Sequence, residues 1–114
     1  MLPEAKSFYI TDKEYPQYIG TAEVTLMYPA LFEMPKEIDT SRTWYYFSRI
    51  FVHRKIRNKG HATRLMQQLI EWADTYDYHI FCDINPYGDL TLEQLIVFYK
   101  KFGFKQIRKS TMIR

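Results

Sequence analysis

The stretch that decides the fold covers residues 43–76, and its central part, residues 52–64, reads VHRKIRNKGHATR. Residues 43–53 (TWYYFSRIFVH) are aromatic and β-branched, which predicts a strand, with a well-buried C-terminal half around Ile50 to Val52. From Gly60 onward the apolar residues follow the spacing of one helix face. They are Ala62, Leu65, Met66, Leu69, Ile70, Ala73 and Tyr76. The sequence therefore predicts a strand, a basic loop and then a helix that opens at a glycine.

The start of this helix is suited to bind a phosphate group. The first N–H groups of a helix have no partner within it, and the helix dipole adds positive charge there. Arg57 and Lys59 add further positive charge beside Gly60. The segment lacks both the glycine-lysine pattern of nucleotide triphosphatases and the three-glycine dinucleotide fingerprint. Its composition alone also fits an ordinary capped helix beside a solvated basic loop.

Strands and helices continue on both sides of this stretch. Alternating apolar residues and turn signals predict strands at residues 19–28, 79–84 and 104–113, a loop at 29–41 and a turn at 85–89. Thr91 and Gln94 form a capping box for a second helix, for which Gly103 suits the C-terminal cap. This order of elements predicts an α/β or α+β fold with helices packed on a sheet.

Length and composition restrict the class of protein. The chain has 114 residues, 46% of them hydrophobic, which fits a single domain over residues 1–114 that folds without disulfides. No apolar run has the length of a membrane-spanning helix, and residues 1–9 carry no secretory signal. Cys82 is the only cysteine, so we expect a cytoplasmic, reducing environment.

Positive charge is concentrated in the middle of the chain. No acidic residue lies between Asp39 and Glu71, whereas seven basic residues do. They are Arg42, Arg49, Arg54, Lys55, Arg57, Lys59 and Arg64. Such a segment predicts a polyanionic ligand, either a phosphorylated cofactor or nucleic acid.

Two motifs carry a resemblance to a known family. Residues 57–62 read Arg-x-x-Gly-x-Ala after a strand that ends in Val52, and residues 99–104 read Tyr-x-x-x-Gly-Phe. With the order of elements over residues 43–106, the chain resembles the GCN5-related N-acetyltransferase (GNAT) superfamily. The resemblance implies a mixed central sheet with helices packed on it, acetyl-CoA as co-substrate, and direct transfer of an acetyl group to an amine acceptor.

The resemblance also implies where acetyl-CoA binds. The backbone of Ile50, Phe51 and Val52 would bond the pantetheine amides. The pyrophosphate would lie against a loop made of Arg57, Asn58, Lys59, Gly60, His61, Ala62 and Thr63. The asparagine that the family often carries seven residues before its tyrosine is replaced by Leu92, and Asn85 is the candidate to take its place.

Tyr99 is the candidate general acid, by its resemblance to the family's tyrosine. A phenol has a reference pKa near 10 and a thiol one near 8.5, so a tyrosine can give a proton to a leaving thiolate at modest cost. On spacing alone, seven residues after Leu92 on an apolar helix face, Tyr99 would be a core residue of its helix.

The general base is left open by the sequence. Where the family often has a glutamate, Tyr46 stands. Glu33, Asp39 and Asp83 are candidates that could act through water, and the acceptor could also bind in its neutral minority form.

The histidines and the cysteine offer no alternative chemistry. His53, His61 and His79 are too scattered for metal-ligand spacing, so no metal site is expected and they are interpreted as loop and strand-end residues. Cys82 lies in an apolar strand and is interpreted as a small buried side chain.

The segment before residue 19 is short for this family, which usually has a strand and two helices there. Residues 7–10 allow a shortened first strand, and residues 11–18 have no room for two helices. The resulting open front favours a macromolecular acceptor or a homodimer. The alternative function is a non-catalytic binding module of the same fold for nucleic acid or a protein partner, because basic and aromatic residues together bind nucleic acid.

Overall fold

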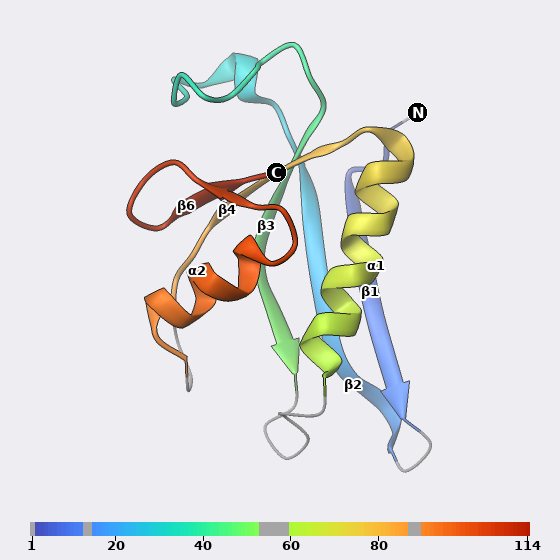
Figure 1. Ribbon diagram of the computed structural model, residues 1–114. Coiled ribbons are helices and arrows are strands. Elements are labelled where there is room, and N and C mark those ends of the chain that lie inside the picture. Colours follow the sequence, from blue (N-terminus) through green and yellow to red (C-terminus); the bar gives the residue numbers. More distant parts are fainter. Residues whose placement is uncertain (1, 13–14, 53–59, 87–89) are drawn as a thin grey trace.

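A mixed six-stranded sheet with the order β1-β2-β3-β4-β6-β5 forms the frame of the molecule (Figure 1). The structure is a computed structural model and describes residues 2–12, 15–52, 60–86 and 90–114. The strands are β1 (Ala5–Asp12), β2 (Tyr15–Met27), β3 (Trp44–Val52), β4 (His79–Asp83), β5 (Lys105–Gln106) and β6 (Thr111–Ile113). The helices are the short 3-10 helix η1 (Pro29–Leu31), α1 (His61–Tyr76) and α2 (Leu92–Lys100). Only β3 and β4 pair in parallel. The expected mixed α+β fold is confirmed.

Strands β1 and β2 form a long antiparallel hairpin at one edge of the sheet. Ala22 and Val24 of β2 are buried and Glu23 and Thr25 are exposed, as the alternation in the sequence predicts. β1 pairs with β2 from Ala5 opposite Thr25 onward. No helix separates the two strands in the part of the chain that the structure describes, so the expected reduction of the N-terminal region is confirmed.

Helix α1 packs its apolar face on β1, β2 and β3. Its buried residues include Leu65, Met66, Leu69 and Ala73. The expectation for Tyr76 is wrong: it is 58% exposed and stacks on Tyr78 with a centroid distance of 5.5 Å. It is the last residue of α1, so the end of the helix leaves it beside the chain that turns back toward β4.

Trp72 is a half-buried aromatic residue of α1 that the helix pattern did not include. Its ring meets Tyr45 edge-on at 4.9 Å and Phe8 at 5.7 Å. These contacts join α1 to β1 and β3. Such aromatic pairs contribute about 1 kcal/mol each beyond their burial.

Helix α2 begins and ends at the predicted signals. The Thr91 hydroxyl accepts from the Gln94 N–H at 3.2 Å, and the Gln94 side chain accepts from the Thr91 N–H at 2.9 Å. Gly103 has a φ of 87°, which a residue with a side chain rarely adopts. The single last strand expected at 104–113 is wrong. The chain forms a hairpin of β5 and β6, closed by the hydrogen bond from the Ile107 N–H to the Thr111 carbonyl at 2.9 Å.

Both helices cover the same face of the sheet (Figure 1). On the opposite face, Ile38, Trp44 and Phe81 form a second cluster, which the segment between β2 and β3 covers. Farther along that face, exposed side chains of β1, β2 and β3 are not covered by any helix that the structure describes. Among the described helices, none has the length and apolar character needed to cross a membrane.

Candidate active site

The candidate site lies where β3 and β4 stop pairing and diverge. Their parallel pairing runs from Trp44 opposite His79 to Phe47 opposite Cys82. β3 then continues to Val52 and pairs only with β2, as far as the described strands show. On the side toward β4, the backbone of Ser48 to Phe51 therefore has no strand beside it among the described residues. A ligand with amide groups can pair with such a strand edge in place of a neighbouring strand.

A β-bulge coincides with this divergence. Ala22 pairs with Ile50 but Val24 pairs with Phe47, so β3 has one more residue than β2 across this interval. A bulge bends the strand that carries it, and this one directs the end of β3 away from β4. The prediction of a well-buried C-terminal half of this strand is wrong. Ile50 is half-buried and Phe51 is 43% exposed, and only Val52 is buried, because β4 no longer accompanies the strand there.

The start of α1 lies beside the end of β3 (Figure 1). Gly60 precedes the helix with a φ of 79° and a ψ of 10°, and a Cβ added to it would meet nothing within 4 Å. The first hydrogen bond of the helix runs from the Arg64 N–H to the Gly60 carbonyl at 3.1 Å. The N–H groups of His61, Ala62 and Thr63 precede that bond and belong to the anion-binding turn of a helix.

His61 has a structural place that the sequence interpretation missed. Its side chain is 6% exposed and lies in contact with the Arg64 guanidinium. The interpretation as a loop or strand-end residue is therefore wrong for His61. The helix spacing could have shown it, because His61 and Leu65 are four residues apart on the buried face. No group of three or more metal-ligating side chains occurs within the described residues.

Tyr99 projects from α2 to the point of divergence. It is 5% exposed, its ring meets Phe47 edge-on at 6.0 Å, and its hydroxyl lies near the Cys82 thiol. Phe47 and Cys82 are the last residues that pair between β3 and β4. Burial first, and then the neighbouring Cys82, raises the pKa of Tyr99 well above 10.0. The phenol therefore stays protonated at neutral pH and is able to donate.

Cys82 is a buried thiol, as expected. Burial first, and then the negative charge of Asp83, raises the pKa of Cys82 to about 12. A thiol that stays protonated at neutral pH is a poor nucleophile.

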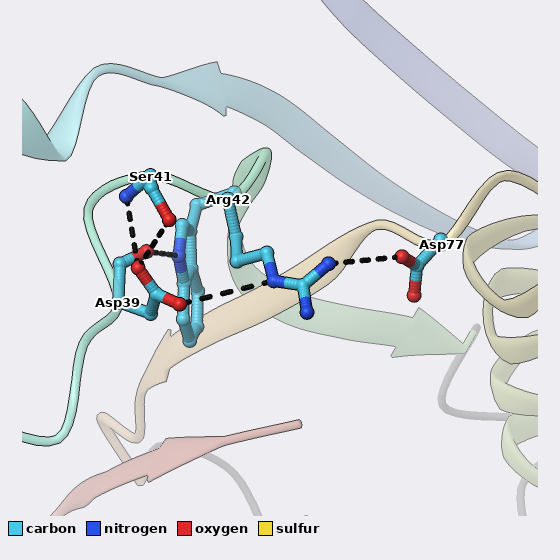
Figure 2. Close-up of polar contacts among 5 residues, drawn as sticks. Asp39, Ser41, Arg42 and Asp77 are labelled. Atoms are coloured by element: carbon cyan, nitrogen blue, oxygen red, sulfur yellow. Dashed lines mark hydrogen bonds and ion pairs between the residues drawn. The ribbon is translucent and has the colours of Figure 1, made fainter.

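Of the seven basic residues in the basic segment of the sequence, the structure describes the side chains of Arg42 and Arg64, which lie at opposite ends of β3. Figure 2 shows Arg42 between two carboxylates: its ion pairs are with Asp77 at 3.4 Å and with Asp39 at 3.8 Å. Arg42 precedes the first residue of β3, whereas Arg64 lies in the first turn of α1 beside the other end of that strand. The segment itself contains no acidic residue, but in the fold two carboxylates from outside it lie beside Arg42.

Four other residues were predicted to belong to the coenzyme site, and the structure describes one of them. Arg57, Asn58 and Lys59 lie outside the described residues. Asn85 is exposed just after β4, beside the same divergence of strands.

These elements match a known family. The sequence profile of the Acetyltransferase (GNAT) family matches residues 2–104. The chain belongs to this family. No curated protein matches the sequence.

Solved structures show the GNAT fold at low sequence identity. The aminoglycoside N-acetyltransferase AAC(6')-Iy in complex with CoA is 18% identical with a TM-score of 0.63, over 94% of this chain and 72% of that one. A putative acetyl transferase from Pyrococcus furiosus is 17% identical with a TM-score of 0.65, over 94% and 63%. The anti-CRISPR protein AcrVA5 is 14% identical with a TM-score of 0.65, and the match covers 98% of this chain and 99% of that one.

Proposed function

We propose that this GNAT protein is an acetyl-CoA-dependent N-acetyltransferase, acting as a single domain, that moves an acetyl group directly to an amine acceptor. The observation that carries the proposal is the divergence of β3 and β4 after Phe47 and Cys82, with the Tyr99 hydroxyl at that point. Solved relatives of the same fold include one in complex with CoA and one with a bisubstrate analogue that contains CoA, which supports acetyl-CoA as the ligand.

The proposed coenzyme site uses the strand edge and the helix start. The backbone of Ile50, Phe51 and Val52 would pair with the pantetheine amides, and the N–H groups from Gly60 to Thr63 would hold the pyrophosphate. Arg57, Asn58 and Lys59 would complete that loop, and Asn85 would contact the pantetheine from the side of β4. This placement brings the thioester to the last paired residues of β3 and β4.

Tyr99 would protonate the leaving thiolate. Its raised pKa keeps the phenol protonated at neutral pH, so a proton is at hand when the thiolate leaves, and proton donation of this kind contributes about 10² to 10⁴ in rate. Direct attack by the amine agrees with the inert state of Cys82, which leaves no thiolate to carry an acetyl group.

The binding-module alternative gains no support from the described basic residues. Arg42 is paired with Asp39 and Asp77, which weakens a continuous contact surface for nucleic acid. Thermal stabilisation by acetyl-CoA favours the enzyme, whereas stabilisation only by an oligonucleotide that salt abolishes favours the module.

Calorimetric titration of acetyl-CoA tests the site with two variants of Gly60. Gly60→Asp adds a negative charge where the pyrophosphate would lie, and Gly60→Asn is the matched control because asparagine has the same shape and tolerates a positive φ. We expect Asp to lower the affinity about 100-fold, or about 2.7 kcal/mol, and Asn to lower it by about 10-fold. A folded Gly60→Asp variant with the affinity of the parent protein would remove the helix start from the site.

A further inference from the structure

Asp83 lies where β3 and β4 part, on the face of the sheet opposite Tyr99. It follows Cys82, the last residue of β4 that pairs with β3. Side chains alternate along a strand. Cys82 is buried in the core with Tyr99, so Asp83 points to the other face, where it is exposed.

The surroundings of Asp83 hold it in place and leave it accessible. The Thr111 hydroxyl donates to Asp83 Oδ1 at 2.9 Å, and the two residues are also paired in the sheet. Tyr46 lies on the same face, with its ring stacked on Phe81 at 6.2 Å. Burial first, and then the negative charge of Asp83, raises the pKa of Tyr46, so these two side chains are within electrostatic reach of each other.

This face has room for an acceptor. The opposite face is covered by α1 and α2, whereas the side of Asp83 has no helix over it among the described residues, which leaves it open to a second substrate. A shallow hollow of about 400 Å³ opens there beside the bulge of β3, and Thr21, Ala22, Glu23, Ser48 and Phe51 line it.

The other candidate carboxylates lie elsewhere. Asp39 Oδ1 accepts from the Ser41 N–H at 3.0 Å and the Ser41 hydroxyl at 2.6 Å, beside the first residue of β3 (Figure 2). Glu33 follows η1 in the segment that covers the same end of the sheet (Figure 1). Glu23, which lines the hollow, was not a candidate in the sequence; it belongs to β2, which β3 separates from β4, and its Oε2 accepts from the Ser7 hydroxyl at 3.0 Å.

Resting on the proposed function, we propose that Asp83 is the catalytic base that receives the proton of the acceptor amine. The amine nitrogen forms a bond to the acetyl carbon as the bond from that carbon to sulfur breaks. The nitrogen's proton goes to Asp83, and the sulfur takes the proton of Tyr99. The two proton transfers occur on opposite faces of the sheet, so the departing thiol and the incoming amine do not compete for one group.

Two CoA analogues test this assignment without knowledge of the natural acceptor. In the first, a two-carbon link joins the CoA sulfur to the nitrogen of butylamine, which makes a charged secondary ammonium at pH 7. In the second, a carbonyl in that link makes the nitrogen a neutral amide. Calorimetry on the full chain compares their affinities, and unmodified CoA serves as the reference.

We expect the parent protein to bind the ammonium analogue about fivefold tighter than the amide, since a carboxylate beside the nitrogen favours the charge. Asp83→Asn should abolish this preference while the affinity for the amide changes less than about threefold. The variant keeps the Oδ1 atom that Thr111 binds, so its fold is preserved. Glu33→Gln, which removes another exposed carboxylate, should keep the preference.

The outcomes separate the two proposals. Binding of CoA with no preference between the analogues in the parent protein overturns the role of Asp83 and leaves the proposed function standing. A preference that persists in Asp83→Asn also overturns it. Failure of CoA and both analogues to bind overturns the proposed function together with this inference.

Discussion

Replacing Tyr99 with phenylalanine removes one oxygen from the point where β3 and β4 part. The ring contacts with Phe47 at 6.0 Å and Phe104 at 5.5 Å do not involve the hydroxyl, so the packing of α2 is kept. The variant also loses the polar contact of the hydroxyl with the Cys82 thiol. Such a contact contributes about 1 kcal/mol or less to stability, so we expect the variant to fold.

Catalysis should suffer far more than stability. Loss of a positioned proton donor costs 10² to 10⁴ in rate, and we expect kcat to fall about 10²-fold, which corresponds to about 2.7 kcal/mol of activation free energy. Acetyl-CoA affinity should change less than about threefold, because the proposed contacts to the coenzyme come from the β3 backbone and the start of α1. A fall in kcat with unchanged coenzyme affinity is the signature of a group that acts in the transition state.

The assay is thiol release from acetyl-CoA, with an acceptor chosen from a panel of amines, peptides and aminoacyl conjugates, together with calorimetry of acetyl-CoA. Tyr45→Phe is the matched control. Tyr45 is also a buried tyrosine, two residues before Phe47 in β3, but its hydroxyl donates to the Pro3 carbonyl at 2.8 Å, which precedes β1. The control should lose a similar amount of stability and keep its turnover.

Full turnover in a folded Tyr99→Phe protein would refute the role of Tyr99 as general acid and leave it as a core residue. An equal loss of turnover in Tyr45→Phe would also refute the reasoning, because the effect would then follow from lost stability.

Two further predictions concern the thiol and the C-terminus. Cys82→Ser should keep most of the activity, because a thiol with a pKa of about 12 is not a nucleophile at neutral pH. Intact-mass spectra of the parent protein with acetyl-CoA alone should then show no added acetyl group. An acetyl adduct on Cys82 that passes to the acceptor would contradict direct transfer. Asp74 Oδ1 pairs with Arg114 at 2.6 Å, which lowers the pKa of Asp74 in the folded protein below 3.8. The pair therefore stabilises the fold above pH 3.8. This contribution is lost as the pH falls through the lowered pKa of the folded protein. Asp74 is 59% exposed, so Asp74→Asn should lower the stability by at most about 1 kcal/mol at pH 7. Thermal melts at decreasing pH should show the stabilities of parent and variant converging below pH 3. A difference in stability that stays the same at all pH values would contradict the pairing.

The local signals in the sequence predicted local structure well. The helix face of α1, the capping box at Thr91 and the positive φ of Gly103 each depend on residues within about four positions of one another. The same holds for Gly60, whose place before a helix is confirmed. The errors at Tyr76 and His61 arose at the two ends of α1, where spacing alone does not tell which residue still faces the sheet.

The two sequence motifs gave the family, because each combines a glycine with a specific neighbour at a spacing that a loop or helix end requires. They did not give the base. Glu33, Asp39 and Asp83 are equivalent as carboxylates in a sequence, and only the partners of each in the fold distinguish them.

What the sequence by itself determined is therefore the order and type of most elements, the glycine at the helix start and the membership of the GNAT family. What only the tertiary structure decided is where β3 leaves β4, that both helices cover one face, and that Tyr99 and Asp83 lie on opposite sides of the divergence. These features depend on pairing between residues far apart in the chain, such as Phe47 with Cys82 and Asp83 with Thr111. No local pattern encodes such pairing, because it is set by how the whole sheet and its single helical layer pack together.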